Sequence, residues 1–339
     1  MWCGIQAIRA PNLPERFFGS APRDNCLYTA GAGPFAWQAD MTERSFHLMD
    51  GAMGTELVGR GWPADKNPLW ANVEAPDLVR AVHADYLQAG AECLVTNTFA
   101  GSWMQAQAEQ ASKARWQEAL RCGVRLAREV AAGHTLVLAS LGPPPALCQR
   151  QALSATLIQE TLADYHERLF LLADADAYFF ETQPSLEVAH RAASSCPFDK
   201  PIWFSFALIS SPAGAITFAE GKTPAEIAER LDQITQVRVL GINCGRLPDL
   251  DSMVRALVAM RAASSLPLLA RPNASTVLGA QPAGPSDNEQ AQKPARPNAL
   301  IARFVQAAGR LSAIGVSWIG GCCGIGPDAI AAVHSAHKP

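Results

Sequence analysis

The sequence predicts an α/β protein built as a single (β/α)8 barrel of the TIM type. From about residue 46, a short apolar run followed by Gly, Asn, Thr or Ser recurs eight times. Stretches rich in Ala, Leu, Glu and Arg, a composition typical of helices, separate these runs. The runs are apolar without clean alternation, as in a parallel sheet covered on both faces. Eight β/α units in succession favour the barrel.

The elements follow in order along the chain. The expected strands are Phe46–Met49, Cys93–Thr96, Thr135–Ala139, Ala177–Phe180, Ile202–Phe206, Val237–Ile242, Leu266–Ala270 and Val316–Ile319. Three of the intervening helices are expected to start at proline, because Pro76, Pro224 and Pro327 each precede a helical stretch. Residues 279–297 are rich in Pro, Gln, Ala and Asp, which predicts an exposed loop between the seventh strand and its helix.

A doubly wound open sheet is the alternative fold. A GxGxxG motif after the first strand would favour it, because that motif binds dinucleotides at a helix start. The nearest match, Asp50–Gly54, lacks this spacing. The barrel is therefore preferred.

Length and composition suit one barrel with an extension. The chain has 339 residues, whereas a barrel of this type takes about 250. We expect the barrel to span residues 46–336. Residues 1–45, which are rich in Pro, Gly and Ala, should form a low-order extension without a secretory signal. The net charge is −3, with no long basic run and no apolar run of membrane-spanning length. Neither nucleic acid nor a membrane is therefore an expected partner.

Nine cysteines in a chain without a signal are not expected to form a disulfide framework, and we expect a cytoplasmic location. Six of them lie singly and are expected to be small hydrophobic residues or unreactive thiols: Cys3, Cys26, Cys93, Cys122, Cys148 and Cys196.

The other three cysteines follow strands. Cys244 follows the sixth strand, and Cys322 and Cys323 follow the eighth. In a TIM barrel the carboxyl ends of all strands meet at one rim, where the active site lies. Glycines beside the cysteines would let the backbone turn so that all three bind one ion. A pair that only packs, or that forms a redox disulfide, is the alternative.

Three thiolates suit a catalytic zinc ion. Zinc prefers four tetrahedral ligands, so three protein ligands leave one position open. No CxxC pair, the usual mark of a structural zinc, occurs in the sequence. Such an electron-rich zinc is a weak Lewis acid but suits the binding of a fourth thiol, whose pKa it lowers. The expected chemistry is alkyl transfer to a substrate sulfur. A zinc hydrolase and a non-catalytic zinc- or thiol-binding barrel are the rival interpretations.

Three segments resemble the homocysteine S-methyltransferases: Met49–Leu57, Gly241–Cys244 and Ile319–Gly324. Trp203–Phe206 and Arg271–Ala274 look similar to the branch that uses S-methylmethionine. The resemblance covers about residues 46–335. It implies a zinc-dependent barrel that methylates L-homocysteine to L-methionine.

The resemblance also implies roles for single residues. Cys244, Cys322 and Cys323 match the metal ligands of the family and would be its catalytic centre. The matching substrate-binding positions are Asp50 and Gly51 around the amino-acid end, Glu181 for the substrate ammonium, and Thr96 and Asn243 nearby.

The methyl donor is less well defined. A sulfonium or quaternary ammonium cation would be attracted to aromatic faces, for which Phe99, Trp70 and Trp203 are candidates. The segments Gly142–Ser154 and around Trp70 are shorter than the family pattern, and both lie where the donor would bind. Betaine is therefore retained as an alternative donor. No cobalamin or folate module accompanies the barrel, and a homo-oligomer stays possible.

Overall fold

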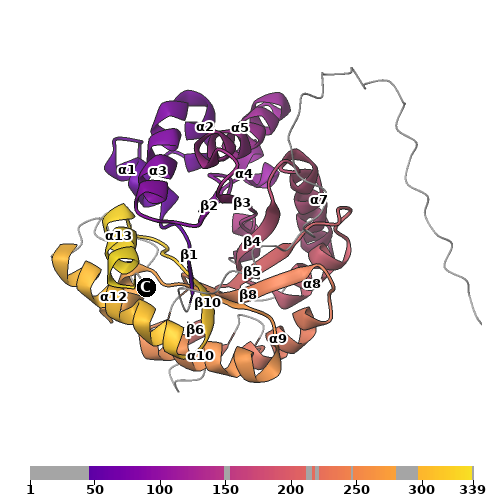
Figure 1. Cartoon of the computed structure of the whole chain (residues 1–339). Coiled ribbons are helices and arrows are strands. Elements are labelled where there is room, and N and C mark those ends of the chain that lie inside the picture. The colour runs from indigo at the N-terminus through magenta and orange to yellow at the C-terminus, as the bar shows by residue number, and fades with distance from the viewer. Residues whose placement is uncertain are drawn as a thin grey trace, which may run out of the picture. The chain divides into compact units, whose positions relative to one another are not determined.

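A sheet of eight parallel strands forms the centre of the structure (Figure 1). The computed structural model describes residues 46–148, 153–210, 216–217, 221–245, 247–279 and 297–337. The strands of the sheet are β1 (His47–Leu48), β2 (Cys93–Val95), β3 (Leu136–Ser140), β4 (Ala177–Gln183), β5 (Ile202–Phe206), β8 (Val237–Asn243), β9 (Leu268–Arg271) and β10 (Val316–Ile319). Their order in the sheet is β1-β10-β9-β8-β5-β4-β3-β2.

The two ends of this sheet meet and close the barrel. A parallel bridge joins Met49 to Cys93, and the Glu92 N–H donates to the Leu48 carbonyl at 2.7 Å. Closure brings the carboxyl ends of all eight strands to a single rim. The predicted fold class is confirmed, and all eight expected strands are present within a few residues of their predicted bounds.

Helices surround the strands (Figure 1). They are α1 (Met53–Gly59), the 3-10 helix η2 (Pro68–Trp70), α2 (Ala71–Glu74), α3 (Pro76–Gln88), α4 (Trp103–Ala108), α5 (Lys113–Ala131), α6 (Pro145–Cys148), α7 (Ala155–Leu171), α8 (Leu186–Ser194), α9 (Pro224–Asp232), α10 (Leu250–Ala263), α11 (Ala274–Leu278), α12 (Pro297–Ala313) and α13 (Pro327–Ala336). The predicted proline starts of α3, α9 and α13 are confirmed. At α9 a capping box between Thr223 and Glu226 satisfies the free N–H groups of the first turn.

Two features differ from the sequence-based expectation. Strand β4 continues to Gln183, three residues beyond its predicted end at Phe180. Its pairing with β5 shifts register between Phe180 and Gln183, so polar residues continue a strand whose apolar run has ended. A second, antiparallel pair, β6 (Ile209–Ser210) with β7 (Ile216–Thr217), was not expected. The predicted extension over residues 1–45 and nearly all of the 279–297 loop lie outside the described residues.

A layer of rings fills the barrel interior. The Trp203 ring on β5 lies 4.8 Å from that of Trp318 on β10 and 6.5 Å from that of Phe179 on β4. The His47 ring stacks on Trp318 at 4.5 Å. Because β5 and β10 are not neighbours in the sheet, their rings meet across the interior. Trp203 is therefore a core residue, and its candidacy as a donor-binding aromatic is wrong.

No helix in the described part of the chain is long and apolar enough to cross a membrane.

His83 on α3 is a buried polar group without a partner. Its side chain is 0% exposed, and neither ring nitrogen has a hydrogen-bond partner among the described residues. Burial lowers the pKa of His83 to about 4, from an ordinary 6.5. The unfolded chain therefore binds a proton at His83 more readily than the folded protein does. As a result, the contribution of neutral His83 to the free energy of unfolding is fully present above pH 6.5 and is lost as the pH falls towards 4.

We expect the free energy of unfolding to fall by about 2 kcal/mol between pH 7 and pH 4.5 because of His83 alone. His83→Leu should lack this part of the fall, since leucine does not titrate. Urea unfolding of both proteins at the two pH values, with a chelator present to remove any metal contribution, measures the difference. Equal falls in the two proteins would contradict the assignment.

Candidate active site

The three cysteines predicted to bind metal lie together at the rim. Cys244 directly follows β8, and Cys322 and Cys323 lie in the loop between β10 and α13. The Cys323 sulfur is 3.9 Å from the Cys244 sulfur and 3.9 Å from the Cys322 sulfur. All three lie within 4.8 Å of one another.

The turn after β9 holds both cysteine loops in place. The Cys244 N–H donates to the Arg271 carbonyl at 3.1 Å, and the Cys322 N–H donates to the Pro272 carbonyl at 3.0 Å. The Ala274 N–H in turn donates to the Cys323 carbonyl at 2.9 Å. One short segment therefore fixes loops that are almost 80 residues apart in the sequence.

The backbone at the cysteines is unusual. Cys244 has a φ of +49°, a left-handed conformation that costs a non-glycine residue energy and is found mainly at functional sites. Gly320 and Gly321 are needed for close packing. A Cβ on Gly320 would lie 2.7 Å from the Asp50 carbonyl, and one on Gly321 would lie 2.3 Å from the Ile325 side chain. Glycine at these positions therefore lets the loop pack closely, with Gly320 against the end of β1 and Gly321 against Ile325. Close packing is thus a second reason for glycine here, besides the backbone turn expected from the sequence.

The sulfur positions fit a tetrahedral metal ion. Zinc–sulfur bonds of about 2.3 Å in a tetrahedron separate the sulfurs by about 3.8 Å, close to the two separations of 3.9 Å. Within the described ranges, no other group of His, Cys, Asp and Glu side chains has this arrangement. Cys323 is exposed while Cys244 and Cys322 are half-buried, so a fourth ligand could approach from solvent.

The cluster also stabilises the ionised form of one of its three thiols. Hydrogen bonds from the Cys322 and Cys323 thiols hold the pKa of Cys244 well below its ordinary value. The same contacts raise the pKa of the other two thiols. A cluster that already stabilises one thiolate is suited to binding a soft cation.

Glu181 lies beneath the rim on β4 and is held by two neighbours. The Ser140 hydroxyl donates to Glu181 Oε2 at 2.7 Å, and Asn243 Nδ2 donates to Oε1 at 3.2 Å. Asn243 Nδ2 also donates to the Thr182 hydroxyl at 2.7 Å. Glu181 and Asn243, both predicted to bind substrate, are therefore in contact, and Glu181 is 8% exposed.

Asp50 uses both carboxylate oxygens within the protein. Oδ2 accepts the Val95 N–H at 2.7 Å, and Oδ1 accepts Arg271 Nη2 at 3.0 Å. Burial raises the pKa of Asp50 to about 7, although the Arg271 guanidinium opposes this rise. At Gly51 a Cβ would lie 2.3 Å from the Ile325 carbonyl. Asp50 thus organises the loop through both of its carboxylate oxygens.

Thr96 and Phe99 lie at the end of β2. The buried Thr96 hydroxyl contacts that of Thr98 at 2.6 Å and accepts the Ser140 N–H at 3.0 Å, which links it to the residue that holds Glu181. Phe99 is 41% exposed. Trp70, by contrast, is buried, and its indole donates to Glu109 at 2.6 Å. Of the three aromatic candidates, only Phe99 presents a ring to solvent.

The sequence assigned no role to Arg271 or Ser140, which prove central. Arg271 directly follows the predicted seventh strand. Its partners Asp50 and Glu181 come from other strands, so their pairing with Arg271 could not be predicted from the local sequence. A charged residue directly after the apolar run of β9 was the available signal. For Ser140 no signal was available, since a single hydroxyl at a strand end is common.

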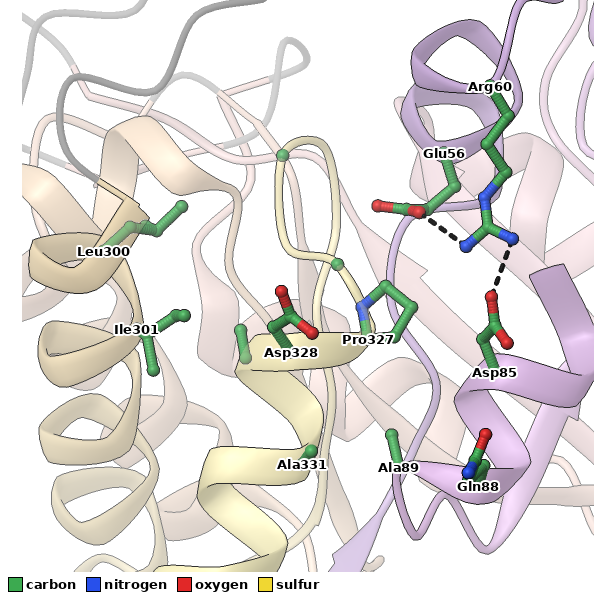
Figure 2. Close-up of a pocket in the computed structure, with 13 residues that line it drawn as sticks. Glu56, Arg60, Asp85, Gln88, Ala89, Leu300, Ile301, Pro327, Asp328 and Ala331 are labelled. Atoms are coloured by element: carbon green, nitrogen blue, oxygen red, sulfur yellow. Dashed lines mark hydrogen bonds and ion pairs between the residues drawn. The ribbon is translucent and has the colours of Figure 1, made fainter.

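A pocket of about 560 Å³ lies outside the barrel, between α1, α3, α12 and α13. Figure 2 shows Arg60, which directly follows α1, between Glu56 and Asp85, with ion pairs of 3.0 and 2.7 Å. Asp328 and the apolar Leu300 line the facing side. None of the predicted site residues lines this pocket, although Gly324, which directly follows Cys323, does.

Comparisons with known proteins agree with the site. Residues 47–337 match the family described as "Homocysteine S-methyltransferase". Homocysteine S-methyltransferase 2 of Zea mays is 28% identical over 85% of this chain and 88% of its own length. Homocysteine S-methyltransferase of Escherichia coli (strain K12) is 28% identical over 88% of this chain and 97% of its own.

A solved structure extends the similarity to the fold. The homocysteine methyltransferase MmuM from Escherichia coli, in its metallated form, superposes with a TM-score of 0.71 at 27% identity. The match covers 89% of this chain and 99% of that one. With a family match over most of the sequence and the cysteine cluster at the expected rim, this chain belongs to the homocysteine S-methyltransferase family.

Proposed function

We propose that this protein is a zinc-dependent enzyme that moves a methyl group from S-methylmethionine, or a related sulfonium donor, to the thiol of L-homocysteine, giving L-methionine. The observation that carries the proposal is the position of the Cys244, Cys322 and Cys323 sulfurs, which lie within 4.8 Å of one another at the rim. An open, thiolate-rich site of this kind suits a thiol acceptor better than a carbonyl or a phosphate.

The metal ion belongs to the proposal. Bound by three thiolates, zinc can accept a fourth thiol and lower its pKa, which keeps that thiol nucleophilic near neutral pH. The chain contributes a preformed cluster: the β9 turn fixes both loops, and Asn273 Nδ2 lies 3.9 Å from the Cys244 sulfur as a further hydrogen-bond donor. The cysteines must be reduced for this role, which fits a cytoplasmic location.

The amino-acid end of the acceptor would bind beneath the sulfurs. Glu181 is the proposed partner of the substrate ammonium, because Ser140 and Asn243 orient its carboxylate. Asp50 and Gly51 would line the neighbouring side of the site. Thr96 holds Ser140 in place by accepting a hydrogen bond from its N–H. Fixing the acceptor at both ends would align its sulfur for in-line attack on the donor methyl.

The donor would approach from the exposed side of the rim. Its cationic centre favours an aromatic face, and Phe99 offers one beside the backbone of Gly142. Displacement of the methyl group leaves a neutral thioether when the donor is a sulfonium ion, so no group on the protein has to protonate the leaving group. The two substrates are the proposed small-molecule partners; a homo-oligomer stays a prediction.

Activity tests the proposal directly. Purified, zinc-loaded protein should form methionine from homocysteine and S-methylmethionine, and do so faster than from homocysteine and betaine. Homocysteine labelled in its carbon chain distinguishes methionine made from the acceptor from the methionine that S-methylmethionine leaves behind, and a deuterated donor methyl group shows by mass spectrometry which molecule supplied it. Faster turnover with betaine would show that betaine, and not a sulfonium compound, is the donor. Zinc uptake with no methionine from any donor would favour a non-catalytic metal-binding barrel.

Removing one sulfur tests the ligand assignment. Cys244→Ala should lose bound zinc and lower activity by more than about a hundredfold, because two thiolates hold the ion poorly. Cys196→Ala is the matched control: Cys196 is half-buried like Cys244 but lies outside the cluster, before the amino end of β5, so both zinc and activity should be kept. Metal analysis gives the zinc content per chain. Full zinc content in Cys244→Ala would show that the ligand set is wrong.

A further inference from the structure

A buried ion pair on α7 contacts the loops that follow β2 and β3. Arg168 Nη2 lies 2.8 Å from Asp164 Oδ2, one helical turn away, and the two side chains are 0% and 3% exposed. Nη2 also donates to the Gly142 carbonyl at 2.9 Å, and Asp164 Oδ1 accepts the Trp103 N–H at 2.6 Å. The pair therefore joins one helix to two loops at the rim of the barrel.

The contact to Trp103 supplies a helix cap that the local sequence does not. Trp103 is the first residue of α4, and Ser102, at its N-cap, makes no capping hydrogen bond within the described part of the chain. Asp164 accepts the first N–H instead, and a negative charge stabilises the start of a helix. The end of the β2 loop is thus fixed by a residue 61 positions later in the sequence.

The β2 and β3 loops meet at Phe99. A Cβ on Gly142 would lie 2.4 Å from the Phe99 carbonyl oxygen and 2.7 Å from Cδ2 of its ring, so Phe99 packs directly against the Gly142 backbone. Phe99 is 41% exposed and is the aromatic candidate that presents its ring to solvent. Arg168 therefore holds the backbone against which the ring packs, and Asp164 holds the end of the loop that carries the ring.

The pair is costly for a contact that serves stability alone. Arg168 Nε and Nη1 are buried, and no described residue accepts a hydrogen bond from either. Apolar side chains of similar volume often replace a buried ion pair without loss of stability, so a partly satisfied pair indicates a different role. Its two further hydrogen bonds indicate which role, because both go to the loops around Phe99.

We propose that Asp164 and Arg168 are positioning residues for the methyl donor: they fix the Phe99 ring at the rim, so that the cationic centre of the donor is held in line with the acceptor sulfur. The inference rests on the proposed function, which gives Phe99 its role. Both residues are buried and act through the two loops, without touching a substrate. A displacement of about 1 Å can lower a rate by about 100-fold, so a loop that carries a binding group needs rigid support.

The test replaces the ion pair by an apolar pair. Asp164→Val combined with Arg168→Met removes both charges together, so no buried charge is left unpaired and the variant should fold. The hydrogen bonds to Trp103 and Gly142 are lost with them. In the zinc-loaded enzyme, the KM for S-methylmethionine should rise by about 10-fold or more. The KM for homocysteine and the zinc content should stay within about twofold of the wild-type values, since the cysteine cluster is untouched.

A double-mutant cycle shows whether the pair acts through Phe99. Phe99→Leu should itself raise the KM for the donor, because the aromatic face is lost. Adding the double substitution to Phe99→Leu should raise this KM no further, because residues that act as one unit are not additive. Gly142→Ala should reproduce the donor defect with the ion pair intact, since the new Cβ displaces Phe99.

Tyr178→Phe is the matched control for stability. The buried Tyr178 hydroxyl donates to the Leu169 carbonyl of the same helix at 2.9 Å, near the amino end of β4 and away from the rim. Losing this hydrogen bond should lower stability while both KM values stay unchanged.

A merely structural role would give a different result. If the double variant raises the two KM values equally, loses zinc, or leaves both KM values unchanged, the inference is overturned. Additive effects of the double substitution and Phe99→Leu on the donor KM overturn it as well. Should the double variant not fold, Arg168→Lys takes its place, because lysine keeps the charge but lacks the planar group that contacts both Asp164 and Gly142.

The proposed function can fail separately. A zinc-loaded wild-type protein that forms no methionine from any donor overturns that function and the inference with it. An active wild type whose donor KM is unchanged by Phe99→Leu overturns the inference alone. If betaine is the faster donor, the KM comparison is made with betaine, whose quaternary ammonium would contact the same ring.

Discussion

The turn that follows β9, residues 271–274, is the segment on which the rim of this barrel depends. Its backbone hydrogen bonds hold Cys244 on one side and the Cys322–Cys323 loop on the other. The Arg271 side chain pairs with Asp50 across the closed sheet. One turn therefore positions the sulfurs, the first-strand loop and the cation beneath them, so the geometry of the cluster follows from the consecutive order of β8, β9, β10 and β1 in the sheet.

This arrangement has an energetic cost that the surrounding contacts offset. Cys244 and Thr182 both have left-handed backbone conformations, with φ of +49° and +58°, each costing on the order of 1–3 kcal/mol. Removing one partner of a buried ion pair such as Arg271–Asp50 costs about 3–5 kcal/mol. Strain and buried charge gathered at one rim are typical of a site in which position matters more than stability.

The sequence predicted the barrel because its evidence is local. Each strand is an apolar run, and each helix start carries its own signal, such as the proline of α9 or α13. The meeting of Cys244 with Cys322 and Cys323 could also be predicted, because strand ends share one rim in this fold. The sequence therefore predicted that the three cysteines lie close together, and the structure confirms this. Their role as metal ligands is still a prediction.

The remaining features depend on side-chain direction and on register across the closed sheet, which no single segment encodes. Asp50 was expected to hold substrate, which stays a prediction, but its hydrogen bonds to Val95 and Arg271 were not expected. Trp203 was one of three aromatic candidates, and its inward direction on β5 places it in the core. Arg271 finds its partner 221 residues earlier in the sequence. The two-residue strands β6 and β7 are too short to leave a pattern.

The central claim is that three protein sulfurs hold a zinc ion that is open to a thiol. X-ray absorption at the zinc edge measures this most directly, because it counts the sulfur neighbours of the bound metal. The account predicts three sulfurs at about 2.3 Å and one lighter ligand in the protein alone, and four sulfurs once homocysteine is added. Two or fewer protein sulfurs, or a count that homocysteine leaves unchanged, would contradict it.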